Sequence, residues 1–505
     1  MKSTVIKIMS TILAVLVFSA GVMICDLQPS YADEAQQYIK VGLRYGSSAQ
    51  EIYSLSFSDS VSIGIAENGS FTLLETYPDI KDITVERVSD AIVVYGTNSI
   101  GDVICINENY PEANCVMPVT YEEDGIFNLD GKNYRGGVVF NAEGGSLNLI
   151  EYVEVDKYLY GVINSELHKD YPLEALKAQA VAARSFTICK LNTHKLYGFD
   201  ICGTTHCQVY KGFDDEYPET TQAVDETRGE TIKYNGKTVA AFYSKNSGGH
   251  TQASEEVWSG KEGYLRAKKD EYSPVYKWES TMTFSDIETK LYVAGYNVGA
   301  LEKISIESRY ESGAVAELVF TGSNGTATLK KEKIRTVLGG SYIKSTMFAF
   351  DGEVVYGEEQ EIEKPEVEEE PEEIVAEGIY GLSNEGTKGS SLSSSVWVVG
   401  PDGELIKKSL SSIYVTNGDT VKKPVAQNVT AKEETKKEDT TTVSKNNGTS
   451  YHISGESVAY GPEVKFTGLG SGHGVGMAQD GVIEMAKKGF TYRDILKYYY
   501  TDIEI

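Results

Sequence analysis

Positive charge is scarce in this chain. Its 505 residues include 47 Lys and Arg against 74 Asp and Glu, which gives a formal net charge of −27 at pH 7. A protein that follows phosphate backbones needs clustered lysine and arginine. The composition therefore argues against nucleic acid as a partner.

Several familiar signatures are also missing. No Gly-x-Ser-x-Gly elbow accompanies the six histidines, which weakens a serine hydrolase interpretation. No Lys-Ser or Lys-Thr pair follows the glycine-rich stretch at 468–479, so that stretch is not a phosphate loop. No repeat of the solenoid type is present. The chemistry must therefore come from polar clusters that are far apart in the sequence.

Changes in composition predict the domain organisation. Residues 358–377 contain eleven Glu, one Lys and two Pro, which is typical of a solvated spacer. The length is enough for two or three domains. We predict a signal peptide over 1–32, a main domain beginning at 33–356, an acidic linker over 357–379, an inserted β-like segment over 380–421, a disordered polar linker over 422–450, and the rest of the main domain over 451–505.

The first residues have the order of a secretion signal. Lys2 and Lys7 precede an apolar run over 8–24, and small residues lead up to Ala32, the predicted cleavage site. Without cleavage the same run would be a membrane anchor. We therefore expect export, with extracellular or cell-wall location. Because exported thiols tend to oxidise, Cys105 and Cys115 are candidates for a disulfide.

The expected fold class is α+β, a β-rich domain around a buried alanine-rich helix. Residues 36–150 alternate short β-rich runs with Gly, Asn and Asp turns. Asp170 and Pro172 form a helix-start signal, and five alanines follow at helical spacing over 173–186. Strand-like patterns return at 229–250 and 301–350, and a final helix is expected over 480–488.

Glu166 is the first candidate for chemistry. It lies among apolar residues just ahead of the alanine-rich helix, at an expected junction of loop and helix. Partial removal of a carboxylate from water raises its pKa, so that it holds a proton near neutral pH, as a general acid must. A helix-capping or surface glutamate is the alternative.

Sulfur and nitrogen donors gather after the helix. Cys202, His206 and Cys207 lie within six residues, and His194 is eight residues upstream, which together are the donors that zinc prefers. Four protein ligands would make zinc structural, whereas three would leave a position for water. A disulfide between the two cysteines, or unrelated buried thiols, are the alternatives. His168 and Cys189 are substitutes for the fourth ligand.

A glycine-rich loop over 468–479 is the third candidate. Glycine at every second position allows the backbone to approach a ligand or another strand closely, and His473 and Gln479 would point into that space. A tight structural turn is the alternative. A smaller loop of the same kind contains Ser247, Gly248 and Gly249.

These stretches together resemble one family. Residues 158–162, 174–184, 205–208, 247–249 and 472–477, with Glu166, fall in the order found in the sporulation stage II protein D/LytB (SpoIID/LytB) family. Two departures are Met477-Ala-Gln-Asp-Gly481, where the family usually continues Met-Ser-Gln-Tyr-Gly, and the missing proline shortly after Glu166.

The resemblance implies a function. The family includes lytic transglycosylases that cut peptidoglycan glycan strands, notably strands without stem peptides, and enhancers of wall amidases. It implies that Glu166 is the catalytic acid, that Cys202, His206 and Cys207 lie in a zinc-binding segment, and that Arg184 matters for activity. We expect Arg184, Ser247, Gly248, Gly249, His473 and Gln479 to line the substrate groove.

Overall fold

The computed structural model describes residues 38–142, 145–359 and 449–505, and four short strands between 395 and 422. The chain divides into two compact units, residues 1–364 with 446–505 and residues 365–445. The predicted signal peptide lies outside the described residues, as do most of the two predicted linkers. The strands in the second unit form two hairpins: β22 (Ser395–Val399) with β23 (Leu405–Ser409), and β24 (Val415–Thr416) with β25 (Val421–Lys422).

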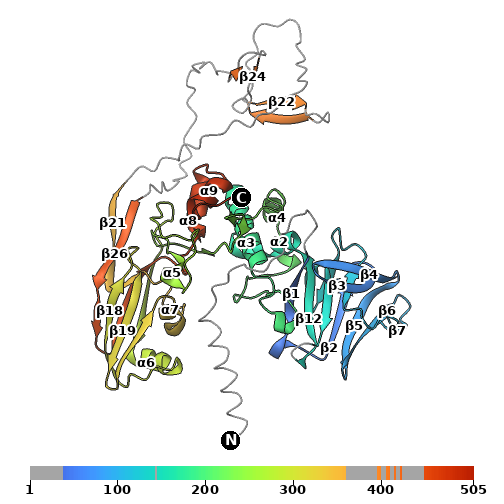
Figure 1. The fold of residues 1–505 in the computed structure, drawn as a ribbon, viewed down its shortest axis with the longest axis horizontal. Coiled ribbons are helices and arrows are strands. Elements are labelled where there is room, and N and C mark those ends of the chain that lie inside the picture. The colour runs from blue at the N-terminus through green and yellow to red at the C-terminus, as the bar shows by residue number, and fades with distance from the viewer. Residues whose placement is uncertain are drawn as a thin grey trace, which may run out of the picture. The chain divides into compact units, whose positions relative to one another are not determined.

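The N-terminal β-rich runs form strands, as predicted, and these strands lie in two sheets (Figure 1). Alternation in β2 (Ile52–Phe57) buries Tyr53, Leu55 and Phe57 and exposes the residues between them. The first sheet has the order β13 (Ile201–Cys202), β1 (Tyr38–Arg44), β12 (Asn148–Glu154), β11 (Gly137–Asn141), β8 (Cys115–Pro118), β3 (Val61–Glu67), β4 (Ser70–Tyr77). The second has the order β10 (Lys132–Arg135), β9 (Ile126–Leu129), β2 (Ile52–Phe57), β5 (Ile80–Val88), β6 (Ala91–Asn98), β7 (Val103–Cys105).

The alanine-rich helix is buried, which confirms the expected α+β fold class. Helix α3 (Leu173–Cys189) contacts four other helices, and all five of its predicted alanines are fully buried. Small side chains let these helices approach closely (Figure 1). The neighbours are α2 (Val155–Glu166), α4 (Pro218–Asp225), α8 (Gln479–Lys487) and α9 (Tyr492–Tyr499).

The helix boundaries differ in detail from the expected ones. Helix α3 begins after Pro172, which is its N-cap, and Asp170 makes no capping bond there. The expected final helix is α8, but α9 follows it, so the prediction of a single C-terminal helix was wrong. This region also contains one more short helix, α5 (Ser254–Val257), and four short strands. The strands are β14 (Lys233–Tyr234), β15 (Lys237–Thr238), β16 (Tyr243–Ser244) and β29 (Met477–Ala478).

A second hydrophobic core lies within the predicted main domain. Phe320, Phe348, Phe350 and Phe466 are fully buried in it. One sheet has the order β17 (Lys277–Thr283), β28 (Glu463–Leu469), β21 (Phe348–Glu359), β26 (Thr449–Glu456). The other has the order β20 (Gly325–Lys330), β19 (Val315–Gly322), β18 (Leu301–Arg309), β27 (Val458–Tyr460), and the helices are α6 (Phe284–Val293) and α7 (Lys333–Leu338).

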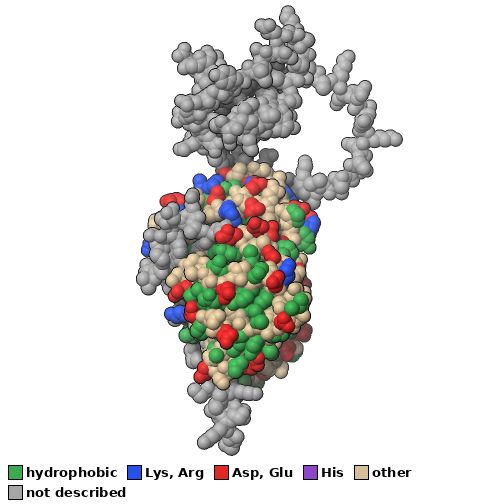
Figure 2. All heavy atoms as spheres, turned by 90° about the vertical axis from the view of Figure 1, so that its right-hand side faces the viewer, with side chains coloured by type: hydrophobic (Ala, Val, Ile, Leu, Met, Phe, Trp, Pro, Cys, Tyr) green, Lys and Arg blue, Asp and Glu red, His purple; other side chains and the backbone are tan. Residues whose placement is uncertain are grey.

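Three further features concern membrane-spanning helices, the surface composition and the cysteines. Among the described residues, no helix is both long and apolar enough to cross a membrane. Figure 2 shows hydrophobic side chains interspersed with acidic ones on one face of the molecule. Cys105 and Cys115 are both free thiols and lie in different sheets, so the disulfide expected between them is not formed.

Candidate functional site

Glu166 is the last residue of helix α2, whereas we expected it at a junction between a loop and the alanine-rich helix. The sequence Val155–Glu166 buries eight of its residues and stops at Leu167, whose extended backbone ends the helix. The C-terminal end of a helix carries partial negative charge, which disfavours a carboxylate anion there. The position of Glu166 therefore already favours the protonated acid.

Two side chains from distant parts of the chain hold the Glu166 carboxyl. Tyr243 donates from its hydroxyl to Oε1 at 3.3 Å, and Gln479 donates from Nε2 to Oε2 at 3.1 Å. Burial raises the pKa of Glu166, while these two hydrogen bonds lower it and only partly offset the burial. Glu166 as a whole residue is nevertheless partly exposed.

The glycine-rich loop delivers Gln479 to Glu166. Strand β29 pairs in parallel with β16, and Gln479 is the first residue of helix α8 directly after β29. Gly476 has φ 72°, and a Cβ there would lie 2.2 Å from the backbone oxygen of Phe242. Gly470 has φ 79° and approaches the backbone of Gly248 in the same way. The glycines therefore serve close packing of two backbone segments.

A buried amide supports Tyr243. Gln208 donates from Nε2 to the Tyr243 hydroxyl at 3.0 Å, and its Oε1 accepts from Tyr158 at 3.2 Å and from Thr187 at 2.9 Å. With its Oε1 occupied by two donors, Gln208 presents its amide N–H to Tyr243, whose own proton is then directed to Glu166. Neither Gln208 nor Tyr243 was assigned a role from the sequence, although both stand beside residues that were.

The four predicted metal donors converge next to this network. One donor atom each from His194, Cys202, His206 and Cys207 lies within 4.8 Å of every other. The contacts are 3.3 Å from His194 Nε2 to Cys207 Sγ, 3.3 Å from His206 Nδ1 to Cys207 Sγ, and 3.8 Å from His206 Nδ1 to Cys202 Sγ. Tetrahedral zinc would separate such donors by roughly 3.4–3.8 Å.

The chemistry of this cluster suits a metal ion as well as its spacing does. Hydrogen bonding with Cys207 lowers the pKa of Cys202, so one thiolate forms readily. Cys202 and Cys207 are free thiols, which sets aside the disulfide alternative. Of the proposed substitutes, His168 pairs instead with Asp170 at 3.1 Å, and the Cys189 thiol contacts the Thr238 carbonyl at 3.5 Å.

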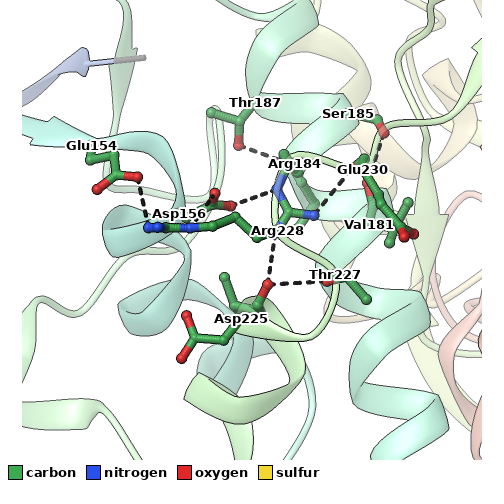
Figure 3. Close-up of polar contacts among 12 residues, drawn as sticks. Glu154, Asp156, Val181, Arg184, Ser185, Thr187, Asp225, Thr227, Arg228 and Glu230 are labelled. Atoms are coloured by element: carbon green, nitrogen blue, oxygen red, sulfur yellow. Dashed lines mark hydrogen bonds and ion pairs between the residues drawn. The ribbon is translucent and has the colours of Figure 1, made fainter. Parts of the chain in front are cut away.

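The prediction that Arg184 lines the substrate groove was wrong. Its side chain is 1% exposed, and it donates to Asp156 at 2.6 Å and to the carbonyl oxygens of Glu230 and Val224 at 3.1 and 3.2 Å (Figure 3). Arg228, on the loop after α4, pairs with Glu154, the N-cap of α2, at 2.8 Å. A guanidinium committed in this way cannot reach a substrate, so Arg184 fixes α2 and α3 to the loop that follows α4.

The prediction that Ser247, Gly248 and Gly249 line the groove was also wrong. Ser247 is 3% exposed, and its hydroxyl donates to Asp270 at 2.7 Å, so it does not line an open groove. Gly248 and Gly249 have φ 71° and 95°, and a Cβ on Gly248 would lie 2.9 Å from the Leu469 carbonyl oxygen. These three residues shape the contact with the 468–479 loop and do not present groups to a ligand.

His473 is a partly exposed residue. Burial lowers its pKa to about 4, so the ring is neutral at physiological pH. Its Nδ1 accepts from the backbone N–H of Val475 at 3.0 Å, and its ring packs against Trp258 with centroids 5.1 Å apart. A neutral ring packed on an aromatic side chain suits contact with a ligand better than proton transfer.

Comparison with known proteins gives a consistent result. Residues 143–234 match the family model of the stage II sporulation protein SpoIID, and residues 243–363 match a domain of unknown function, DUF8618. Over 412 residues the chain is 30% identical to the amidase enhancer of Bacillus subtilis (strain 168), which covers 78% of this chain and 47% of that protein.

Two further relatives agree with these matches. Stage II sporulation protein D of the same organism is 31% identical over 208 residues, or 38% of this chain and 59% of that protein. An uncharacterized protein of Brachyspira hyodysenteriae is 31% identical over 236 residues, or 46% and 62%. In each of these three comparisons the matched part is less than two thirds of the relative's own length.

Proposed function

This chain belongs to the SpoIID/LytB family and has a role connected with the cell wall; from that premise we propose that it is a lytic transglycosylase of peptidoglycan glycan strands. The observation that carries the proposal is the environment of Glu166. Glu166 is a partly exposed residue whose carboxyl has a pKa raised by burial, and two neutral donors, Tyr243 and Gln479, hold that carboxyl.

The proposed reaction needs one acid that later acts as a base. Protonated Glu166 donates its proton to the glycosidic oxygen between muramic acid and the next sugar, and the bond from that oxygen to the anomeric carbon breaks. The C6 hydroxyl of the muramic acid then bonds to the anomeric carbon and loses its proton to the Glu166 carboxylate. The products are a 1,6-anhydro end and a new free sugar hydroxyl, and Glu166 is protonated again.

In the part of the chain that the structure describes, no other carboxylate is among the groups that shift the pKa of Glu166, which supports this class of reaction over ordinary glycoside hydrolysis. Hydrolases of the common kind use two carboxyl groups. Among the described residues, the interactions that shift the pKa of Glu166 are burial and the bonds from Gln479 and Tyr243, with no second carboxylate. Tyr243 and Gln479 hold the carboxyl during both proton transfers and stabilise the anion between them.

We also propose that His194, Cys202, His206 and Cys207 hold zinc. Four protein ligands would close the site, so the metal would fix the loop after α3 and would not touch the sugar. That loop contains Gln208, which follows Cys207 and donates a hydrogen bond to the Tyr243 hydroxyl. Export across the membrane is part of the same proposal, because glycan strands lie outside it and residues 1–32 have the pattern of a signal peptide.

A second function is favoured by one observation. The relative with the longest match among those above is called an amidase enhancer. In this alternative the chain binds the wall and stimulates an amidase, and Glu166 transfers no proton. Amidases or other wall hydrolases are proposed partners in either case.

Digestion of purified glycan strands separates the two functions. The full chain is incubated alone with strands that carry or lack stem peptides, and products are identified by mass spectrometry. We expect 1,6-anhydromuramyl ends from the wild type and none from Glu166→Gln, with strand binding retained. If the wild type releases nothing alone but raises the activity of an added amidase, the enhancer function is correct and the transglycosylase proposal is wrong.

A further inference from the structure

Three lysines beside the second core each lie over a tyrosine ring. All three are at least partly exposed, and in the part of the chain that the structure describes none of them forms an ion pair with a carboxylate. We call these lysines and their rings the lysine–tyrosine surface. The distances from Nζ to the ring centre are 5.1 Å for Lys290 over Tyr342, 5.0 Å for Lys333 over Tyr296, and 5.6 Å for Lys344 over Tyr276.

The parts of this surface are joined to one another. Helices α6 and α7, which carry Lys290 and Lys333, contact each other. Lys290 also lies against the loop that follows α7, because a Cβ on Gly339 would be 3.5 Å from its Nζ. The same loop leads to Lys344, whose carbonyl oxygen accepts from the backbone N–H of Gly472 at 2.8 Å. The surface therefore runs from the two helices to the glycine-rich loop.

The carboxylates on α6 and at the start of α7 are engaged elsewhere. One accepts from a backbone N–H, one from a threonine hydroxyl and one from an arginine, so none of them neutralises the lysines. The pairs are Glu288 with the Leu301 N–H at 2.6 Å, Asp286 with Thr283 at 2.8 Å, and Glu332 with Arg335.

The rings hold the ammonium groups without cancelling their charge. A tyrosine face attracts a cation through its quadrupole, which restricts the side chain but leaves the positive charge available to a ligand. The whole chain has a net charge of −27, so a group of unpaired cations on one surface is not what its composition leads one to expect. Such a group favours binding of an anion.

The kind of cation indicates the kind of anion. Lysine binds phosphate as a point charge, whereas the planar fork of arginine suits a carboxylate. Several ammonium groups along one surface match a ligand whose charge repeats, since an isolated anion would use only one of them. A linear polymer joined by phosphodiesters has both properties.

We propose that Lys290, Lys333 and Lys344 bind a linear phosphodiester polymer of the cell wall. This goes beyond the proposed cutting of glycan strands, because it rests on the connection with the cell wall and not on proton transfer by Glu166. Binding of the polymer holds the chain on the wall. Because the surface ends at the glycine-rich loop, it also brings the wall close to the Glu166 site.

Binding of poly(glycerol phosphate) to the full chain tests the proposal. The polymer is titrated calorimetrically, with polyglutamate of equal charge and inorganic phosphate for comparison. We expect poly(glycerol phosphate) to bind more tightly than either, and to weaken as salt is added. Lys290→Met with Lys333→Met should raise its dissociation constant about 25-fold, since one lysine near an anionic surface contributes about fivefold. Adding Lys344→Met should weaken binding further.

Two lysines outside this surface provide a charge-matched control. Lys132 lies over Tyr134 at 5.2 Å and Lys488 over Tyr272 at 5.4 Å, so Lys132→Met with Lys488→Met removes the same charge from similar surroundings. This double variant should bind the polymer as the wild type does. Arginine at positions 290 and 333 should retain affinity, which separates loss of charge from a change in fold.

Three outcomes would overturn the proposal. They are no binding of poly(glycerol phosphate), equally tight binding of polyglutamate, and an equal loss of affinity in the two double methionine variants. A failed transglycosylase proposal appears instead as absence of anhydro product from the wild type, which these titrations do not involve.

Discussion

Glu151 and Glu166 each accept a hydrogen bond from a tyrosine, and the two glutamates differ in access. Glu151 on β12 is fully buried and accepts from the Tyr210 hydroxyl at 2.7 Å, and burial raises its pKa to about 8. Glu166 accepts from Tyr243 at 3.3 Å, and burial raises its pKa too, but the side chain stays partly exposed. A raised pKa alone therefore does not identify a catalytic acid; access for a ligand is also needed.

The largest expected difference between the pairs is in turnover. Glu166→Gln removes the proton donor and should lower the rate of strand cleavage by about 10²–10⁴-fold, the usual contribution of general acid catalysis. Glu151→Gln replaces a neutral acid by a neutral amide of the same shape and should leave the rate unchanged. Rates of anhydro product formation measure both. A rate loss in Glu151→Gln as large as that in Glu166→Gln would contradict the distinction.

Metal removal should affect both pairs together. Gln208, which supports Tyr243, and Tyr210, which supports Glu151, follow Cys207 on one loop. Loss of zinc held at a hundredfold excess over its dissociation constant should lower the free energy of unfolding by about 3 kcal/mol. Thermal unfolding before and after chelation, with metal content measured, gives the result. An unchanged midpoint after verified removal would show that no metal holds this loop.

The two tyrosines should separate in the pH dependence of activity. Tyr243→Phe removes a hydrogen bond that favours the Glu166 carboxylate, so the pKa of Glu166 should rise and the alkaline limb of the rate profile should move to higher pH. We expect turnover to fall roughly fivefold, the net worth of about one hydrogen bond.

Tyr210→Phe is the control for that variant. It should leave the rate profile in place but lower the free energy of unfolding by about 1–3 kcal/mol, because a buried acceptor loses its donor. A shift of the alkaline limb of the rate profile in Tyr210→Phe would mean that the buried Glu151–Tyr210 pair affects the ionisation of Glu166.

A further prediction concerns the dependence of folding stability on pH. The folded pKa of Glu151 is about 8, whereas an unfolded glutamate ionises near its usual value of 4.5. Between these values the folded chain binds the extra proton, so its stability falls as pH rises, by about 1.4 kcal/mol per unit for one full proton. Denaturant unfolding from pH 5 to 8 should show a shallower fall for Glu151→Gln. Equal slopes would place the Glu151 pKa close to its ordinary value.

Helices and strands could be predicted from the sequence better than the burial and the contacts of their side chains. The helix α3 follows from its alanine spacing and the β-rich character of the N-terminal region from its short β-forming runs. The metal donors are close in sequence, so their convergence could be anticipated. Arg184 and Ser247 looked like groove residues because a polar side chain in a motif does not reveal its burial. Tyr243 and Gln208 were missed because their roles depend on a contact between segments that are 35 residues apart.

The hydrogen bonds to Glu166 are made by residues on either side of the second core in the sequence, since Tyr243 precedes it and Gln479 follows it. A nascent or proteolysed chain that ends anywhere between these two residues has the glutamate and the four metal donors but not the amide that holds the acid. Under the proposed function, both hydrogen bonds to the acid are therefore available only in a chain that has been synthesised past Gln479.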